Sequence, residues 1–339
     1  MPRDTVYLAA AGTALPGDPV DNAALAKLLG VSEEWIDLFV GTRARHFAWD
    51  PATGEVLRTL ADLCAEAGAR ALEAAGLGPA DIEFLVLATA TPDHLLPTTA
   101  TEVADRLGMD HLPVYQLQAG CSGAVQALDL GRRLVAGGHR AGLLIGGDVT
   151  HRFLAVRRSA ARMPTEELVN HVLFGDGAGA VVLTAEPGEE AVALRGVLNR
   201  CAGLRRPPGQ FIDWSGLSDR DTERRMLAED YKAIEEHVPA ISVEIVWELL
   251  GELGWTVDEV DHILPPQLSG RMTARIMERL PVPSATEVSC VSETGNTGNA
   301  LPFLQLDRLL PRLDRGQRAL AVTVESSKWI RAGFALEKA

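Results

Sequence analysis

One cysteine stands where a strand pattern gives way to a helix pattern. Cys121 lies within QLQAGCSGAVQALDLGRRL, residues 116–134, between Gly120 and Gly123. At the start of a helix, unpaired backbone N–H groups and the helix dipole favour negative charge, so this position suits a thiolate nucleophile. The alternative is packing, because free cysteine is a small hydrophobe that is usually buried.

A second glycine-flanked turn, SETGNTGN at residues 292–299, contains Asn296. It occupies the same place in an internal repeat as the Cys121 turn, so we expect Cys121 and Asn296 to lie near each other at facing helix N-termini. Amide donors, including the backbone N–H of Cys121, would then surround the oxygen of an acyl group carried by the sulfur. Asparagine in such a turn is also expected for backbone reasons, since it tolerates positive φ.

The elements that position these two turns recur in the same order. Moving the sequence by 176 residues superposes Ala124 on Ala300 and Leu128 on Leu304, in register with the strand patterns. Each copy is predicted to alternate apolar strands with helices. The first copy has strands at 81–90, 113–119, 141–149 and 178–186 and helices at 98–109 and 122–138; the second has strands at 260–266, 286–291, 318–325 and 332–338 and helices at 271–280 and 300–313.

Apolar strands that alternate with helices indicate an α/β fold in which parallel sheets are covered on both faces. Two such units would pack as a duplicated five-layer αβαβα structure. The chain is therefore divided into an N-terminal half, 1–185, which carries Cys121, and a C-terminal half, 186–339, which carries the asparagine turn. Insertions are expected at 20–60 and at 195–240, the second as an irregular cap or loop. Such loops are often functional, although surface elaboration is an equal alternative.

Composition excludes several functional classes. The 339 residues are 47% apolar, enough for a substantial core, and the net charge of −14 argues against nucleic acid or an anionic membrane surface as partner. The four cysteines are far apart without a CxxC pair, which suits neither a disulfide framework nor a zinc site. No metal and no cofactor are expected. The N-terminal apolar run is too short for a signal peptide or a membrane span, and the chain is predicted to be cytoplasmic.

Four separated motifs resemble the ketoacyl-acyl-carrier-protein synthase III group of the thiolase superfamily. They are VSEEWIDLFVGTRARHFA at 31–48, QAGCSGAVQAL at 118–128, LFGDGAGAVVL at 173–183 and the GNTG turn at 295–298. The resemblance covers nearly the whole chain in the correct order. It implies a thiolase-like, five-layered homodimer, a cysteine that accepts an acyl group from CoA or an acyl carrier protein, and a tunnel for the pantetheine arm.

Three departures from the family bear on the chemistry. The family has a strand ending in VPHQAN, whose histidine helps the GNT asparagine to decarboxylate malonyl thioester and to stabilise the carbanion. This chain reads ILPPQLSG at 263–270, with Pro266 at the histidine and Ser269 at the asparagine of that motif. A glycine-rich loop is replaced by ESSKWIRAG at 325–333, and Phe39 stands where the family has an arginine that contacts the CoA nucleotide. These departures argue against decarboxylative condensation by the usual route and leave open whether CoA or a carrier protein is the donor.

The first functional hypothesis is therefore an acyltransferase of the branch that lacks the histidine. The sulfur would take an acyl group from a CoA or carrier-protein thioester and pass it to a hydroxyl or amine of a small-molecule acceptor, such as a polyketide or another secondary metabolite. This reaction needs a base but no decarboxylation. The expected catalytic residues are Cys121, Asn296 and Glu325, and the expected substrate-binding residues are Trp35, Phe174 and Ser269.

Several residues keep more than one interpretation. Glu293 beside the asparagine turn and His94 in TPDHLLPTT are further candidates for the base, and each has a structural alternative. Trp35 lines an entrance or is buried against the body by an amphipathic helix that begins at Ser32. The glycines of FGDGAGA precede a strand, which favours close backbone packing over a phosphate loop. His262 is predicted to be structural.

Two rival functions remain. One is a condensing ketosynthase in which a carboxylate replaces the histidine as base, and the other is a non-catalytic partner that keeps the fold and binds acyl chains. Pro266 counts against the first rival. The presence of both Cys121 and the GNTG turn counts against the second.

Overall fold

The computed structural model describes residues 5–50, 52–154, 164–213 and 227–339. Ten strands form a mixed sheet in the order β12-β11-β13-β14-β8-β1-β7-β6-β4-β5, which mirrors itself about the central β8–β1 pair. Each half of the chain therefore contributes one half of the sheet. The strands are β1 (Val6–Ala14), β4 (Leu85–Thr89), β5 (Val114–Gln118), β6 (Ala141–Asp148) and β7 (Gly177–Thr184) from the first half, and β8 (Val192–Cys201), β11 (His262–Leu264), β12 (Thr286–Glu287), β13 (Arg318–Glu325) and β14 (Ile330–Lys338) from the second.

Strand direction is mixed within each half. β4 pairs in parallel with β5 and β6, and β11 pairs in parallel with β12 and β13. β7 runs antiparallel to β1 and β6, and β14 runs antiparallel to β8 and β13. The prediction of parallel sheets is therefore right for the outer strands and wrong near the centre. The β13–β14 connection shows the reason, because residues 326–329 are too few for a parallel crossover.

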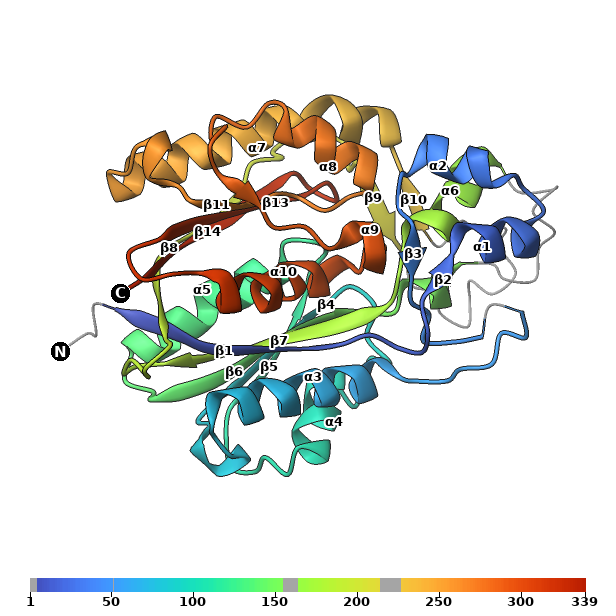
Figure 1. Ribbon diagram of the computed structural model, residues 1–339. Coiled ribbons are helices and arrows are strands. Elements are labelled where there is room, and N and C mark those ends of the chain that lie inside the picture. The colour runs from blue at the N-terminus through green and yellow to red at the C-terminus, as the bar shows by residue number, and fades with distance from the viewer. Residues whose placement is uncertain (1–4, 51, 155–163, 214–226) are drawn as a thin grey trace.

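The molecule has the five layers predicted from the sequence. Figure 1 shows α5 and α10 between the two half-sheets, α3 and α4 on one outer face, and α7 and α8 on the other. Apolar strands buried on both faces require this cover, and all residues of β4 and β6 are buried. The helices are α3 (Leu60–Ala75), α4 (Thr99–Arg106), α5 (Gly123–Ala136), α7 (Tyr231–Leu253), α8 (Gly270–Met277) and α10 (Leu301–Leu309).

The two insertions meet at one end of the layers (Figure 1), where Leu25, Ile36, Val172 and Leu227 share one apolar cluster. The first contains β2 (Val20–Asp21), α1 (Asn22–Leu29), α2 (Glu33–Phe39) and β3 (Ala44–Arg45). As predicted, α2 begins after Ser32, whose hydroxyl accepts a hydrogen bond from Trp35 N at 3.1 Å.

The expectation of an irregular segment at 195–240 is largely wrong. β8 extends to Cys201, β9 (Gln210–Ile212) pairs antiparallel with β10 (Leu227–Glu229), and α7 begins at Tyr231. Residues 214–226 lie outside the described part of the chain. The sequence does not show a clear strand pattern for β8, because only residues 192–194 and Leu198 are buried and exposed arginines interrupt the apolar run.

Shorter elements complete the described chain. They are the helices α6 (Thr165–Leu173) and α9 (Val291–Thr294) and the 3-10 turns Pro79–Asp81, Thr150–Phe153, Val257–Glu259, Gly298–Ala300 and Leu310–Arg312. Among the helices of the described residues, none has the length and apolar character needed to cross a bilayer.

Candidate active site

Cys121 lies in the short bend between β5 and α5. β5 ends at Gln118, and α5 begins at Gly123. A side chain at Gly123 would place its Cβ 2.2 Å from Asn299 Oδ1, so only glycine allows the start of α5 to approach the asparagine turn this closely. The bend therefore brings the cysteine from the first half against the turn from the second half.

The second turn follows α9. Gly295 and Gly298 take positive φ angles of 69° and 55°, and Asn296 is not among the residues with positive φ. The backbone explanation for an asparagine at 296 is therefore wrong, because the flanking glycines supply that conformation. The Asn296 side chain is instead ordered by its own turn, since Oδ1 accepts a hydrogen bond from Gly298 N at 3.0 Å. Its Nδ2 group is left as the donor.

Asn299 and the buried carboxylate of Asp148 connect the two turns through hydrogen bonds. Asp148 Oδ2 accepts hydrogen bonds from Asn299 N at 2.8 Å and from Asn299 Nδ2 at 2.9 Å, and the same Nδ2 donates to Ala119 O at 2.9 Å. Asp148 Oδ1 accepts from Thr89 Oγ1, Ala90 N and Thr91 Oγ1. Burial raises the pKa of Asp148, while these hydrogen bonds act in the opposite direction.

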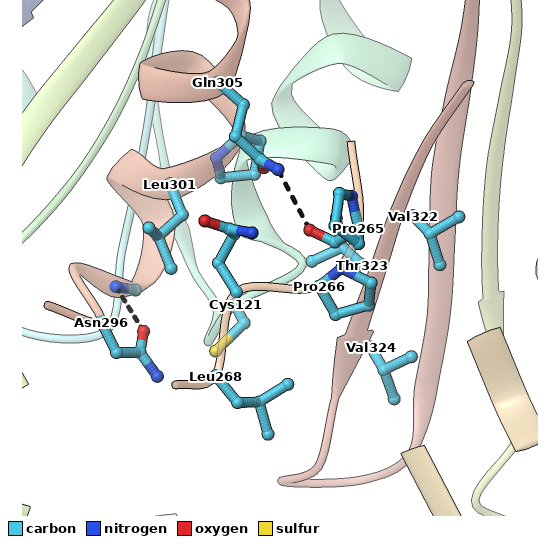
Figure 2. A pocket seen from close by; sticks show the side chains of 13 residues that line it. Cys121, Pro265, Pro266, Leu268, Asn296, Leu301, Gln305, Val322, Thr323 and Val324 are labelled. Atoms are coloured by element: carbon cyan, nitrogen blue, oxygen red, sulfur yellow. Dashed lines mark hydrogen bonds between the residues drawn. The ribbon is translucent and has the colours of Figure 1, made fainter. Parts of the chain in front are cut away.

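Cys121 and Asn296 line one small cavity, as predicted from the repeat. Figure 2 shows both side chains with Pro266 around this space of about 20 Å³. Pro265 and Pro266 are held in the wall, because Gln305 Nε2 donates to Pro265 O at 3.1 Å and Thr273 Oγ1 donates to Pro266 O at 3.1 Å. Proline offers neither a proton nor a lone pair at its ring, so this wall supplies no acid or base.

The Cys121 side chain also lines two larger cavities. One, of about 200 Å³, contains Phe174 and Glu325 in its wall. The other, of about 570 Å³, is large enough for a small-molecule ligand. Cys121 is therefore deep in the protein and still accessible, and among the described residues no histidine lines any of the three cavities.

The expected thiolate is not the resting state of Cys121. Burial raises the pKa of the Cys121 thiol far above its usual range, and the negative charges of Glu325, Asp148 and Glu229 raise it further. The backbone N–H of Cys121 acts in the opposite direction but is outweighed. Desolvation thus overrides the helix dipole, and the thiol needs a base before it can attack a thioester.

Glu325, the last residue of β13, packs against the cysteine bend. Its Oε2 accepts hydrogen bonds from Ser122 Oγ and, at 3.4 Å, from Ser122 N, and its Oε1 accepts from Ser327 Oγ. A Cβ on Gly120 would lie 3.1 Å from the Glu325 carboxyl carbon. Among charged groups, Glu325 also acts most strongly on the Cys121 thiol. The structure therefore brings this predicted base beside the predicted nucleophile.

The three predicted substrate-binding residues differ in the cavities that they line. Phe174 lines the 200 Å³ cavity and forms a backbone bridge with Asn296. Ser269 lines the 570 Å³ cavity, where its hydroxyl also accepts a hydrogen bond from Met272 N at the start of α8. Trp35 is outside the linings of all three cavities and stacks on Phe39, with ring centroids 4.8 Å apart. Phe39 itself lines the 570 Å³ cavity.

The other candidates for the base are engaged elsewhere. The Glu293 carboxylate forms ion pairs with Arg43 and, at 3.0 Å, with Arg308, and it lines none of the three cavities. His94 is exposed and also outside these linings. His262 lies in β11 with its Nε2 atom 3.2 Å from Gln317 Oε1, which agrees with the structural role predicted for it.

Two polar residues of the 570 Å³ cavity were not predicted from the sequence. Gln210 in β9 and Glu229 in β10 line the 570 Å³ cavity together with Cys121. Both come from the segment expected to be an irregular cap. No local motif marks them, because only the pairing of β9 with β10 brings them to the cavity.

Comparisons with known proteins agree with this architecture. The family model for 3-oxoacyl-[acyl-carrier-protein] synthase III matches residues 115–198, and the model for its C-terminal part matches residues 250–326. β-Ketoacyl-[acyl-carrier-protein] synthase III of Rhizorhabdus wittichii is 35% identical over 297 residues, which are 87% of this chain and 87% of that protein.

Two solved structures extend the comparison to nearly the full length. AbyA1, described as a tetronic acid condensing enzyme, is 57% identical with a TM-score of 0.95 over 98% of this chain and 99% of that one. The priming β-ketosynthase of the R1128 polyketide pathway is 28% identical with a TM-score of 0.84 over 99% and 97%. The fold is thus thiolase-like, and the chain belongs to the 3-oxoacyl-[acyl-carrier-protein] synthase III family of acyl-transferring, condensing enzymes.

Proposed function

We propose that this enzyme takes an acyl group from a CoA or carrier-protein thioester onto Cys121 and transfers it to a hydroxyl of a small-molecule acceptor in polyketide-type metabolism. The observation that carries this proposal is Pro266 in the wall of the cavity that holds Cys121 and Asn296. The nucleophile and an amide donor are in place, while the position of the family's histidine carries no proton-transfer group.

Loading begins with loss of the Cys121 proton to Glu325, whose charge already acts on the thiol. The sulfur then attacks the donor carbonyl, a new S–C bond forms, and the C–S bond to the pantetheine arm breaks. The proton passes from Glu325 to the leaving thiolate. Asn296 Nδ2 and the backbone N–H of Cys121 are the donors we assign to the oxyanion, because Asn296 lines the same cavity as Cys121 and the Cys121 N–H already acts on the sulfur.

The acyl-enzyme then reacts with the acceptor hydroxyl. Its oxygen attacks the acyl carbon, an ester C–O bond forms, and the bond to Cys121 breaks. The hydroxyl proton ends on the Cys121 sulfur, so the resting thiol is restored. No carbanion forms in these steps, so the reaction does not need a histidine at the position of Pro266.

A second candidate is carbon–carbon condensation without decarboxylation. The 57% identical AbyA1 is described as a tetronic acid condensing enzyme. A tetronic acid ring contains one ester oxygen and one enolised 1,3-dicarbonyl unit, so its assembly from acyl groups requires one acyl–oxygen and one acyl–carbon bond. A carbon between two carbonyls is acidic enough for a carboxylate-assisted deprotonation. This route also works without a histidine at position 266.

The donor would enter through the mouth of the 570 Å³ cavity. Arg271 and Arg275 line it; Arg271 supplies positive charge for the phosphate that CoA and carrier arms share, whereas the charge of Arg275 is balanced by Glu235. Arg275 is paired with Glu235 at 2.6 Å, and Arg271 donates to Leu38 O. We expect no cofactor, the homodimer that the family resemblance implies, and the cytoplasmic location that the cysteine usage predicts.

Intact-protein mass spectrometry tests the proposal. The protein is incubated with acetyl, malonyl and β-ketoacyl thioesters of CoA and of N-acetylcysteamine. We expect an acyl mass increase that is lost in Cys121→Ala and kept in Cys201→Ala, a control that removes an exposed cysteine. Labelled malonyl thioester should release no CO₂. Release of CO₂ dependent on Cys121, or labelling that survives Cys121→Ala, would contradict the proposal.

A further inference from the structure

The 570 Å³ cavity holds a carboxylate that the loading step leaves unused. Glu229 lines it together with Cys121 and Asn296, from the end of β10. Its Oε1 accepts a hydrogen bond from Gln210 Nε2 at 2.6 Å. Its Oε2 is buried and accepts no hydrogen bond from the residues that the structure describes. A buried carboxylate oxygen without a donor is unusual and suggests that a ligand supplies the missing proton.

Glu229 differs in this respect from Glu325. Both oxygens of Glu325 already accept hydrogen bonds, from Ser122 and Ser327. Glu229 has one engaged oxygen and one open oxygen, and it forms no ion pair with any described residue. Burial raises the pKa of Glu229 to about 7, and the nearby Tyr231 hydroxyl, which donates its proton to Asn170 Oδ1, lowers this pKa to a smaller extent. A carboxylate of this kind exchanges protons readily near neutral pH.

The fold fixes Glu229 relative to the nucleophile. Gly209 N donates to Ser326 O at 3.0 Å, and Asp230 N donates to Gly209 O at 2.7 Å, so the β9–β10 pair is tied to the residue that follows Glu325. A side chain at Gly209 would come within 2.9 Å of the Trp329 ring. The two carboxylates are thus joined through a short stretch of backbone, and Gln210 lines the cavities of both.

We propose that Glu229 is the catalytic base that takes the proton from the acceptor in the transfer step, which rests on the proposed function. The acceptor molecule occupies the 570 Å³ cavity, and its hydroxyl donates a hydrogen bond to Glu229 Oε2. As its oxygen attacks the acyl carbon, the proton moves to Glu229, and the bond from the acyl carbon to Cys121 breaks. Glu229 then returns the proton to the Cys121 sulfur. Glu325 serves loading and Glu229 serves transfer.

Other ionisable groups share this cavity and bear on its pH dependence. They are Cys121, Tyr231, Glu235, Arg271 and Arg275. Glu235 and Arg275 neutralise each other as an ion pair, and the Cys121 thiol is uncharged because burial raises its pKa. The proton affinity of Glu229 is therefore set by its burial and, in the opposite direction, by the Tyr231 hydroxyl.

A loading-and-discharge experiment tests this role. Cys121 is acetylated with acetyl-N-acetylcysteamine, excess donor is removed, and loss of the acetyl mass is followed after addition of glycerol, which supplies hydroxyls. Glu229→Gln should load to the wild-type extent and discharge to glycerol at least about 100-fold more slowly. Glu236→Gln, an exposed carboxylate on α7, is the matched control and should behave as wild type. Hydroxylamine, which attacks thioesters without a base, should discharge wild type and Glu229→Gln equally.

The pH profile separates a base from a structural residue. The wild-type rate of discharge to glycerol should rise with pH and level off above about pH 7. Gln210→Ala removes a hydrogen-bond donor to the Glu229 carboxylate, so its pH profile should move to higher pH. Glu229→Gln should lose the rise of the discharge rate with pH. If Glu229→Gln loads normally and discharges to glycerol within about threefold of the wild-type rate, the role of Glu229 alone is overturned. The same holds if its discharge rate keeps the rise with pH seen in wild type. A wild-type protein that fails to load or to discharge to glycerol overturns the proposed function and this role together.

Discussion

Replacement of Asn299 by alanine tests how the two halves of the chain hold the active site. The Asn299 amide is fully buried and connects Ala119, the residue that follows β5 and lies two residues before Cys121, with the Asp148 carboxylate. Both hydrogen bonds measure 2.9 Å. Asn299→Ala removes them without adding volume, so its effect reports on this connection.

The magnitude follows from the partners that remain. Asp148 keeps four donors, from Thr89, Ala90, Thr91 and the backbone of residue 299, so its carboxylate is not left bare. The lost bond to that charge costs about 2 kcal/mol, and the Ala119 carbonyl left without a donor costs about 2 kcal/mol more. Removal of Asn299 Oδ1, which accepts no hydrogen bond from the described residues, returns about 1 kcal/mol. The net loss of unfolding free energy is roughly 3 kcal/mol.

Urea denaturation measures this loss, and mass spectrometry of Cys121 acylation measures its consequence. We expect Asn299→Ala to lower the unfolding free energy by roughly 3 kcal/mol and to slow loading, because the bend before α5 loses its anchor. Asn199→Ala on β8, whose side chain forms no hydrogen bond among the described residues, should stay within about 0.5 kcal/mol of wild type. An Asn299→Ala protein as stable as this control, with normal loading, would refute the anchoring argument.

Three further predictions concern charge and backbone. Glu325→Gln removes the charge that most strongly opposes ionisation of Cys121, so iodoacetamide should alkylate Cys121 faster at pH 8 while acyl loading slows; parallel changes would contradict the assignment. Gly298→Ala, at φ 55° and with a Cβ 2.2 Å from Asp148 Oδ2, should lose roughly 2 kcal/mol or more in thermal unfolding. Burial, and secondarily the charge of His151, lowers the pKa of His171 to about 4. The unfolded chain therefore binds more protons between about pH 6.5 and pH 4, and the unfolding free energy should fall by up to about 3 kcal/mol as pH falls through this window, a slope that His171→Leu should remove.

Much of the fold follows from local sequence. The run RALAVTVE predicts a strand at 318–325, and β13 occupies Arg318–Glu325. Its residues after Arg318 are buried, so a continuous apolar run is a reliable sign there. At 286–291 the same rule fails, because β12 ends at Glu287 and α9 begins at Val291. An edge strand has one pairing partner, and here only residues 288–290 separate β12 from α9.

The candidate site was likewise predicted from the sequence only in part. The meeting of Cys121 and Asn296 follows from the repeat, since equivalent turns of a duplicated unit come to the same end of the layers. The protonation state of Cys121 does not follow, because Glu325, Asp148 and Glu229 are far away in sequence and near only in the fold. The helix dipole is a local effect, whereas burial and these charges depend on tertiary structure.

The high proton affinity of Cys121 shapes both halves of the proposed reaction. A thiolate beside three carboxylates is costly, whereas a neutral acyl-enzyme at the same place is not. Discharge must therefore regenerate a thiol rather than a free thiolate, which requires a proton on the cavity side as the C–S bond breaks. The acceptor carries that proton into the cavity, and a base with an open oxygen can hold it for the sulfur.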